Sequence, residues 1–185
     1  MEVKLWGVRG SIPTPSQKPE QTVRIKRTLD GFCRSAHYET KNIDGFLDQI
    51  PDSELIGWGG NTTCVEVTSG SKNIIIDAGS GIRQLGLELL NGKYGKEFHI
   101  FLTHFHWDHL LGLPFFVPIF LKGYTLHFYA VQDELETVIR TLFSSPFFPI
   151  TFKMLASSIQ FHKLVPRQSV SVQESCFTPY LLEYP

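Results

Sequence analysis

Short apolar runs separated by glycine and polar turns predict a sheet of several strands. Ile74, Ile75 and Ile76 form an apolar, β-branched run of the kind found in strands buried on both faces. A polar turn at 69–72 before this run is typical of a hairpin. The pattern predicts strands at 3–9, 62–67, 73–76, 98–103, 124–130, 159–165, 169–172 and 176–182.

Helical spacing of apolar positions predicts helices between these strands. Ile82, Leu85 and Leu89 indicate a helix over 82–90, which Asn91 and Gly92 should end. Other helices are expected at 20–32, 43–50 and 134–142, and two prolines exclude a single long helix over the apolar stretch 110–120. The 185 residues suffice for one domain with a sizeable core.

Three histidines and an aspartate occur within six positions directly after the run 98–103. They are His104, His106, Asp108 and His109. Imidazole and carboxylate groups suit zinc, manganese or iron. Side chains alternate along an extended segment, so His104 and His106 should hold one ion, while Asp108 and His109 turn towards a second. Isolated surface histidines are the alternative, but four ligand residues at this density favour a metal site.

Residues near this motif are expected to have structural roles. Phe105 and Trp107 should face the core. Asp77, followed by Gly79 and Gly81, ends a buried strand, and it should either support the metal ligands by hydrogen bonds or cap the next helix. We favour the first role. The remaining histidines with no partner in sequence, His37, His99, His127 and His162, are interpreted as ordinary histidines.

Composition narrows the possible environments and partners. The formal net charge of -1 gives no general attraction to nucleic acid. Three widely spaced cysteines form no CxxC pair, so neither a disulfide framework nor a thiolate zinc site is indicated. The absence of a signal peptide or a membrane-spanning apolar stretch predicts a cytoplasmic protein without a membrane partner.

One segment is locally basic. Lysine and arginine occur at Lys18, Arg24, Lys26, Arg27 and Arg34. They could bind a phosphate-rich substrate, or they could form the solvated face of a helix in an insertion, which is the interpretation we favour.

Four sequence motifs resemble those of metallo-β-lactamase-fold hydrolases. They are GVRGSIP at 7–13, GGNTTC at 59–64, DAGSGI at 77–82 and THFHWDH at 103–109. Together they are similar to the branch containing ribonuclease Z and bacterial phosphodiesterases. The resemblance implies the N-terminal portion of an αββα sandwich over residues 1–185, as a single domain with an insertion at about 16–57.

The resemblance also implies a function. It points to two divalent metal ions held by the four motif residues, preferably zinc, with manganese or iron as alternatives, and to Asp108 as the catalytic residue that orients or deprotonates water. The expected reaction is hydrolysis of a small phosphodiester such as a cyclic nucleotide. Three further family ligands do not occur before Pro185. Either the chain is C-terminally incomplete, or another chain completes the site, as in a homo-oligomer, or the site is reduced.

Two other functions remain open. One is an RNA-processing nuclease like ribonuclease Z, which would use the basic segment as an arm that binds RNA. The other is a truncated, inactive domain that binds metal weakly and serves as an interaction module. A β-lactam or thioester substrate is also compatible with this fold, because the fold alone does not fix the reaction.

Overall fold

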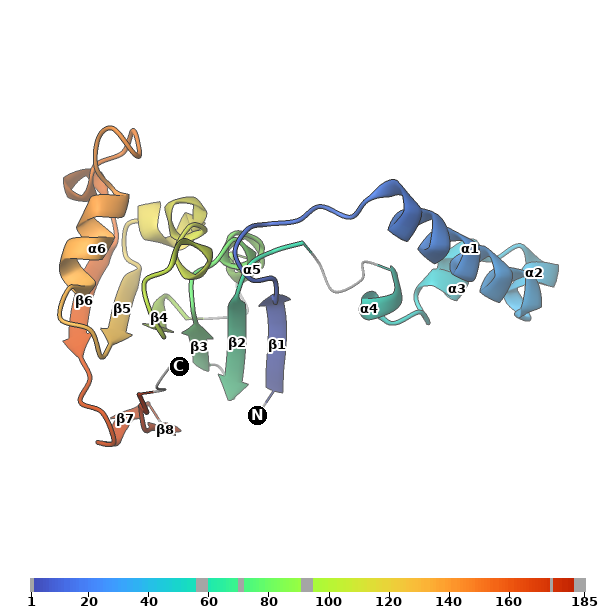
Figure 1. The fold of residues 1–185 in the computed structure, drawn as a ribbon. Helices are drawn as coiled ribbons and strands as arrows, with labels where there is room; N and C mark the ends of the chain where they lie inside the picture. Colours follow the sequence, from blue (N-terminus) through green and yellow to red (C-terminus); the bar gives the residue numbers. More distant parts are fainter. Residues whose placement is uncertain (1, 56–59, 70–71, 91–94, 174, 182–185) are drawn as a thin grey trace. The chain divides into compact units, whose positions relative to one another are not determined.

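The structure, a computed structural model, describes residues 2–55, 60–69, 72–90, 95–173 and 175–181 (Figure 1). It contains two compact units. The sheet unit comprises Met1–Pro13 and Asn61–Pro185, and the helical unit comprises Thr14–Gly60. The segment 16–57, predicted as an insertion, lies within the helical unit.

A six-stranded sheet in the order β1-β2-β3-β4-β5-β6 forms the centre of the sheet unit. The strands β1 to β3 pair antiparallel, whereas β3 to β6 pair parallel. Parallel strands end at the same edge of a sheet, so the residues that follow β3 and β4 lie close together. The strands are β1 (Glu2–Gly7), β2 (Cys64–Ser69), β3 (Lys72–Ile76), β4 (Glu97–Phe101), β5 (Thr125–Ala130) and β6 (Ser158–Lys163).

Helices cover one face of this sheet and enclose the main core. Phe98, Ile100, Leu126 and Phe128 point from β4 and β5 into this core and are completely buried. They pack with residues of α5 (Gly81–Leu89) and α6 (Leu135–Leu142). The mixed α/β fold is therefore confirmed, as is the helix predicted at 82–90.

Short 3-10 helices replace a long helix in the apolar stretch 110–120, as its prolines predicted. Pro114 and Pro118 lie in the first turns of η2 (Leu113–Phe115) and η3 (Val117–Phe120), where a missing N–H costs nothing. Two further 3-10 helices are η1 (Trp107–His109) and η4 (Phe152–Met154).

The opposite face of the sheet carries a small hairpin. It consists of β7 (Val170–Val172) and β8 (Ser175–Phe177), and its apolar side chains pack against Phe101 and Tyr129. The strand predicted at 176–182 is wrong from Thr178 to Leu181, and residue 182 lies outside the described residues. Pro179 has no N–H for a strand ladder, and its carbonyl accepts instead from the amide of Arg167.

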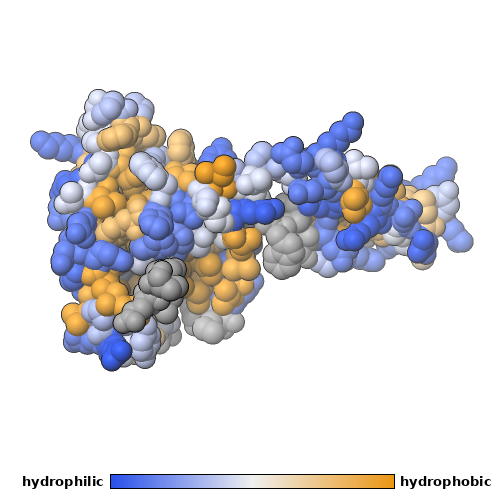
Figure 2. Space-filling model, viewed as in Figure 1, coloured by the Kyte–Doolittle hydropathy of each residue, from blue (hydrophilic) through white to orange (hydrophobic). Residues whose placement is uncertain are grey.

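Part of this second face is solvent-exposed near β1. Val3 and Leu5 are 55% and 50% exposed. Figure 2 shows hydrophobic side chains gathered over β1 and β2 on the face in view. Val3 and Leu5 thus belong to an exposed apolar patch on this second face.

In its described residues, 14–55 and 60, the helical unit contains four helices. They are α1 (Lys18–Arg34), α2 (His37–Thr40), α3 (Ile43–Leu47) and α4 (Asp52–Leu55). The helices predicted at 20–32 and 43–50 are confirmed as α1 and α3, although α3 ends earlier. Aromatic contacts join the elements, since the Phe32 ring lies 5.7 Å from Tyr38 and 5.4 Å from Phe46.

Three predicted turns fall partly or wholly outside the described residues. They are the turn cluster at 57–61, the hairpin turn at 69–72 and the helix end at 91–92. Within the described part of the chain, no helix is both long and apolar enough to cross a membrane.

Candidate metal centre

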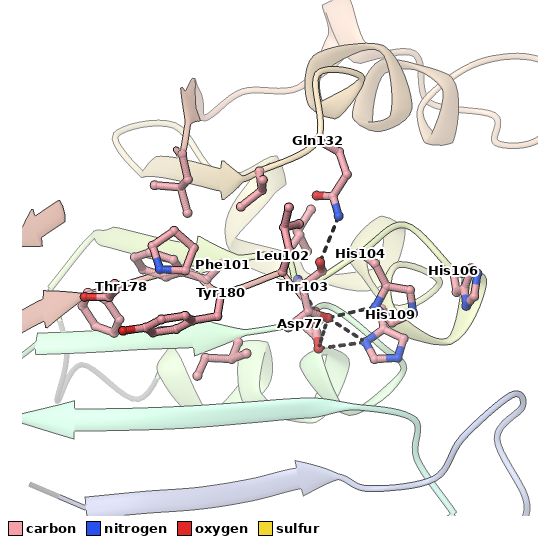
Figure 3. A pocket seen from close by; sticks show the side chains of 16 residues that line it. Asp77, Phe101, Leu102, Thr103, His104, His106, His109, Gln132, Thr178 and Tyr180 are labelled. Carbon is pink, nitrogen blue, oxygen red and sulfur yellow. Dashed lines mark hydrogen bonds and ion pairs between the residues drawn. The ribbon is translucent and has the colours of Figure 1, made fainter. Parts of the chain in front are cut away.

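The motif predicted to bind metal lies in the loop that follows β4. His106 has extended backbone angles, and the chain then turns into η1. The ring centre of His104 lies 4.5 Å from that of His106 and 4.1 Å from that of His109. Figure 3 shows His104 and His109 side by side next to Asp77 and Thr103, with His106 further out. The loop therefore gathers all three imidazoles.

Asp77 connects the end of β3 to this loop. Its carboxylate accepts hydrogen bonds from the amide of Thr103 at 2.9 Å and from the Thr103 hydroxyl at 2.9 and 3.0 Å. Asp77 is almost completely buried and has a φ of 62°, a left-handed conformation that costs about 1–3 kcal/mol in a residue other than glycine. Ser80, rather than Asp77, is the N-cap residue of α5. The helix-capping alternative for Asp77 is therefore wrong.

The same carboxylate orients a motif histidine. Oδ2 of Asp77 lies 2.7 Å from Nδ1 of His109, an arrangement that places the ring proton on Nδ1. The hydroxyl of Thr103 donates to Asp77 and can accept from Nδ1 of His104, which is 3.0 Å away. Both histidines then keep an unprotonated Nε2, the form of imidazole that binds a metal ion.

Asp108 is held by the loop that follows β1. The amide of Ser11 donates to Oδ2 of Asp108 at 2.9 Å, and this hydrogen bond lowers the pKa of the Asp108 carboxyl. Nε2 of His109 lies 3.5 Å from the same oxygen. Ser11 has a φ of 69°, so its backbone is also held in the left-handed region. Two strained residues, Ser11 and Asp77, thus contact the motif side chains directly.

The imidazole of His104 is favoured in its neutral state. Burial lowers its pKa, and the neighbouring His109 and His106 lower it further, against the opposing effects of Asp77 and Asp108. A neutral imidazole is what metal coordination requires.

The two aromatic residues of the motif differ in environment. Phe105 is partly buried and packs against the main core, as predicted. Trp107 is 64% exposed, so the prediction that it faces the core is wrong. The prediction assumed continued alternation, but the chain leaves the extended conformation at Trp107 and begins η1.

A cavity of about 810 Å³ opens beside the motif. His104, His106 and His109 line one part of it. Its other walls include Phe101 of β4, Val131 after β5, Phe177 of β8 and Tyr180 after β8. Figure 3 labels Phe101 and Tyr180 among the lining side chains. A volume of this size can hold a small organic molecule.

Imidazole and carboxylate groups are suitable ligands for divalent metal ions. The hydrogen bonds that orient two of these imidazoles are of the kind found around metal ligands. The rings of His106 and His109 flank that of His104, and Asp77 and Thr103 contact the Nδ1 atoms of His109 and His104. No three of the four motif side chains bring ligand atoms within 4.8 Å of one another. Two ions would share four side-chain ligands here, whereas a catalytic zinc ion usually has three of its own.

Strand pairing brings together a second group that no sequence spacing associates. Glu97 and His99 of β4 and His127 of β5 place three potential ligand atoms within 4.8 Å of one another. His99 and His127, interpreted from sequence as ordinary histidines, are thus neighbours across two strands. The signal appears only when the register of β4 and β5 is known.

The part of the chain that contains the motif is similar to a known protein family and to curated proteins. The family described as Metallo-beta-lactamase superfamily matches residues 57–123. A ribonuclease Z of Pyrococcus furiosus is 33% identical over 93 residues, which cover 48% of this chain and 30% of the relative. A ribonuclease Z of Pyrococcus horikoshii is 29% identical over 103 residues, covering 54% of this chain and 33% of the relative. The matched region thus spans about a third of these curated relatives.

Two solved structures are similar to parts of this chain at low sequence identity. The short form of human tRNase Z covers 90% of this chain and 46% of its own, with 17% identity and a TM-score of 0.46. A diphosphatase from the PhnP family covers 63% and 42%, with 22% identity and a TM-score of 0.46. The resemblance predicted from the motifs is confirmed by the family model, which matches residues 57–123 of this chain.

Proposed function

We propose that this chain belongs to a metal-dependent hydrolase that cleaves phosphodiester bonds. The main support is the position of His104, His106 and His109 beside a cavity, with His109 oriented by a buried carboxylate and lying 3.5 Å from Asp108. Relatives named ribonuclease Z are consistent with this chemistry.

The motif residues would hold two ions in pairs. His104 and His106 would bind one ion, and Asp108 and His109 would bind the other, with zinc as the proposed metal and manganese or iron as alternatives. When bound, such ions lower the pKa of water and offset negative charge on a phosphate group.

The residues of the chain then prepare the site for reaction. Asp77 keeps the ring proton of His109 on Nδ1 and fixes the ring orientation. The amide of Ser11 donates a hydrogen bond to one carboxylate oxygen of Asp108, Oδ2. We propose that the other oxygen of Asp108 orients the attacking water and accepts its proton.

The cavity favours a small substrate with an apolar or aromatic group. A phosphodiester placed against the histidines would direct its substituent towards Phe101, Phe177 and Tyr180. Aromatic rings offer a stacking surface for a nucleobase or an aryl group. A cyclic nucleotide or another small nucleotide diester meets both requirements.

Hydrolysis of bis(p-nitrophenyl) phosphate by the zinc- or manganese-loaded chain tests this proposal. We expect metal-dependent turnover, and His106→Ala should reduce it by at least about 100-fold, because a metal ligand is lost. The matched control is His37→Ala, which removes a histidine of the helical unit and should leave turnover unchanged. A metal-loaded chain without turnover would contradict the hydrolase and favour an interaction module.

A second candidate, an RNA-processing nuclease, is supported by a different observation. Helix α1 carries five lysine or arginine residues and two acidic residues, and none of its residues is buried. If α1 binds RNA, the double variant Lys26→Glu/Arg27→Glu should weaken binding of a precursor tRNA and reduce the salt dependence of that binding. Lys122→Glu, a charge reversal in the sheet unit, is the control. Equal RNA binding by both variants would exclude this role for α1.

A cytoplasmic location is also part of the proposal. The described structure contains three free cysteines, Cys33, Cys64 and Cys176, which suits a reducing compartment. Fractionation of cells that express the protein would test this location.

A further inference from the structure

A second cluster of ligand-type side chains lies at the start of β4 and β5, away from the motif loop. Glu97, His99 and His127 bring one carboxylate oxygen and two ring nitrogens within 4.8 Å of one another. No other group of three histidine, cysteine or acidic residues meets this condition in the part of the chain that the structure describes. We call these three residues the strand cluster.

The pairing of β4 with β5 creates the strand cluster. His99 lies opposite His127 in the parallel register, and their rings stack with centres 4.6 Å apart and an angle of 14° between their planes. Glu97 is two residues before His99, so its side chain lies on the same face of the sheet. Its Oε1 is 2.9 Å from Nε2 of His127 and 3.8 Å from Nε2 of His99.

The other nitrogen of each ring has a partner. Nδ1 of His99 lies 3.0 Å from the hydroxyl of Tyr129, and Nδ1 of His127 lies 3.0 Å from Nε2 of His162. When both Nδ1 atoms carry protons and donate them, both Nε2 atoms are lone-pair acceptors that face Glu97. This pattern of outer hydrogen bonds is the one that orients histidine ligands around metal ions.

The Nε2 atoms are the unexplained part of this arrangement. Neither Nε2 of His99 nor Nε2 of His127 has a hydrogen-bond partner among the described residues, and both atoms are buried. The side chain of His99 is only 7% exposed. The oxygen of Glu97 is close to Nε2 of His127 but outside hydrogen-bond geometry. Buried polar atoms without partners are costly, and a cation between them would remove that cost.

We propose that Glu97, His99 and His127 form a binding site for a divalent transition metal, with zinc as the preferred ion. Two imidazoles and one carboxylate are a known zinc ligand set with a fourth position left for water. Tetrahedral zinc with ligands at about 2.0–2.2 Å separates those ligands by about 3.4 Å. The observed distances of 2.9 and 3.8 Å from Glu97 to the two nitrogens lie on either side of this value.

A simple ion pair between Glu97 and protonated His127 is the competing explanation. It would leave Nε2 of His99 without a partner among the described residues. A cation shared by the three side chains would instead give this buried nitrogen a partner.

Metal binding by the full chain tests the strand cluster separately from the motif. The background variant His106→Ala/Asp108→Ala removes one proposed ligand from each of the two ions at the motif. Titration of this variant with Co²⁺, followed by visible d–d absorption and by displacement with Zn²⁺, should reveal one bound ion per chain. Adding Glu97→Gln or His127→Gln should weaken this binding by at least about tenfold. His37→Gln in the same background should not change it.

The two substitutions differ in their risk to the fold. His127 is buried, whereas the side chain of Glu97 is 58% exposed, so Glu97→Gln should fold normally. Absence of cobalt bands in the background variant would overturn the proposal, as would binding that survives Glu97→Gln unchanged. The readout is metal content rather than turnover. The strand cluster can therefore be correct even if the proposed hydrolase activity is not.

Discussion

The two faces of the six-stranded sheet are built from alternate residues of the same strands, yet they differ in chemistry. On the helix-covered face, Phe98 and Ile100 of β4 lie opposite Leu126 and Phe128 of β5, and all four are completely buried. This face is the ordinary interior of an α/β protein, in which burial of apolar area supplies most of the stability.

The other face carries histidines and aromatic rings. His99 lies opposite His127, and Phe101 opposite Tyr129, with the latter pair stacked at 4.4 Å. Tyr129 also stacks on His162 of β6 at 4.5 Å. Polar ring atoms on this face depend on specific partners, whereas apolar side chains on the first face need only close packing. Alternate positions of β4 and β5 thus place closely packed apolar side chains on one face and hydrogen-bonding rings on the other.

The largest difference between the faces should appear when apolar side chains are deleted. Phe128→Ala should lower the free energy of unfolding by about 3–5 kcal/mol, because it opens a cavity in the main core. Leu5→Ala, at a half-exposed position on the other face, should cost less than about 1 kcal/mol. Urea unfolding monitored by circular dichroism measures both values. Similar losses for the two variants would show that the faces do not differ in this way.

A smaller effect is expected where the sheet edge supports the metal motif. Asp77→Asn should weaken metal binding at the motif by about 10–100-fold, because an amide cannot hold the Nδ1 proton of His109 and the Thr103 donors as a carboxylate does. Zinc titration should be performed in a Glu97→Gln background, so that only the motif is measured. Asp133→Asn, an exposed carboxylate that pairs with Lys163, is the control. Equal zinc affinity in both variants would argue against the supporting role of Asp77.

Most strands and helices could be predicted because their signals are local. The isoleucine run of β3 and the spacing of Ile82, Leu85 and Leu89 in α5 depend only on neighbouring residues. The metal motif was recognisable for the same reason, since its four residues lie within six positions. Where the local pattern changed abruptly, as at Trp107 and after Phe177, the prediction was wrong.

Contacts between distant segments could not be predicted in the same way. The amide of Ser11 reaches Asp108, which is 97 positions away, and only the folded chain reveals this hydrogen bond. His99 and His127 meet through strand pairing, and a shift of one residue in register would move one of them to the other face. The supporting role proposed for Asp77 began with its position at a strand end, but its partner His109 became known only from the geometry.

The smallest expected effect on stability concerns a buried carboxylate on the helix-covered face. Glu66 of β2 is 3% exposed and accepts a hydrogen bond from the indole N–H of Trp6 at 2.8 Å. Its Oε1 has no partner among the described residues. Burial raises the pKa of Glu66, against the opposing effects of Trp6 and Lys4. The helix-covered face therefore disfavours the charged form of Glu66.

The direction of the pH dependence follows from that raised pKa. As the pH rises from the pKa of Glu66 in the unfolded chain to its higher pKa in the folded protein, the unfolded chain loses its proton first. The contribution of Glu66 to stability is then complete at acidic pH and is lost as the pH rises through the folded-state pKa. Glu66→Gln cannot titrate, so it should increase the free energy of unfolding at pH 8 by about 1 kcal/mol, with little gain at pH 4. Urea unfolding at both pH values measures this change.

The control is Glu88→Gln, which removes a partly exposed partner of Lys4 and should change stability by less than about 0.5 kcal/mol. A gain in Glu66→Gln that is equal at both pH values would mean that packing, rather than the charge of Glu66, limits this face.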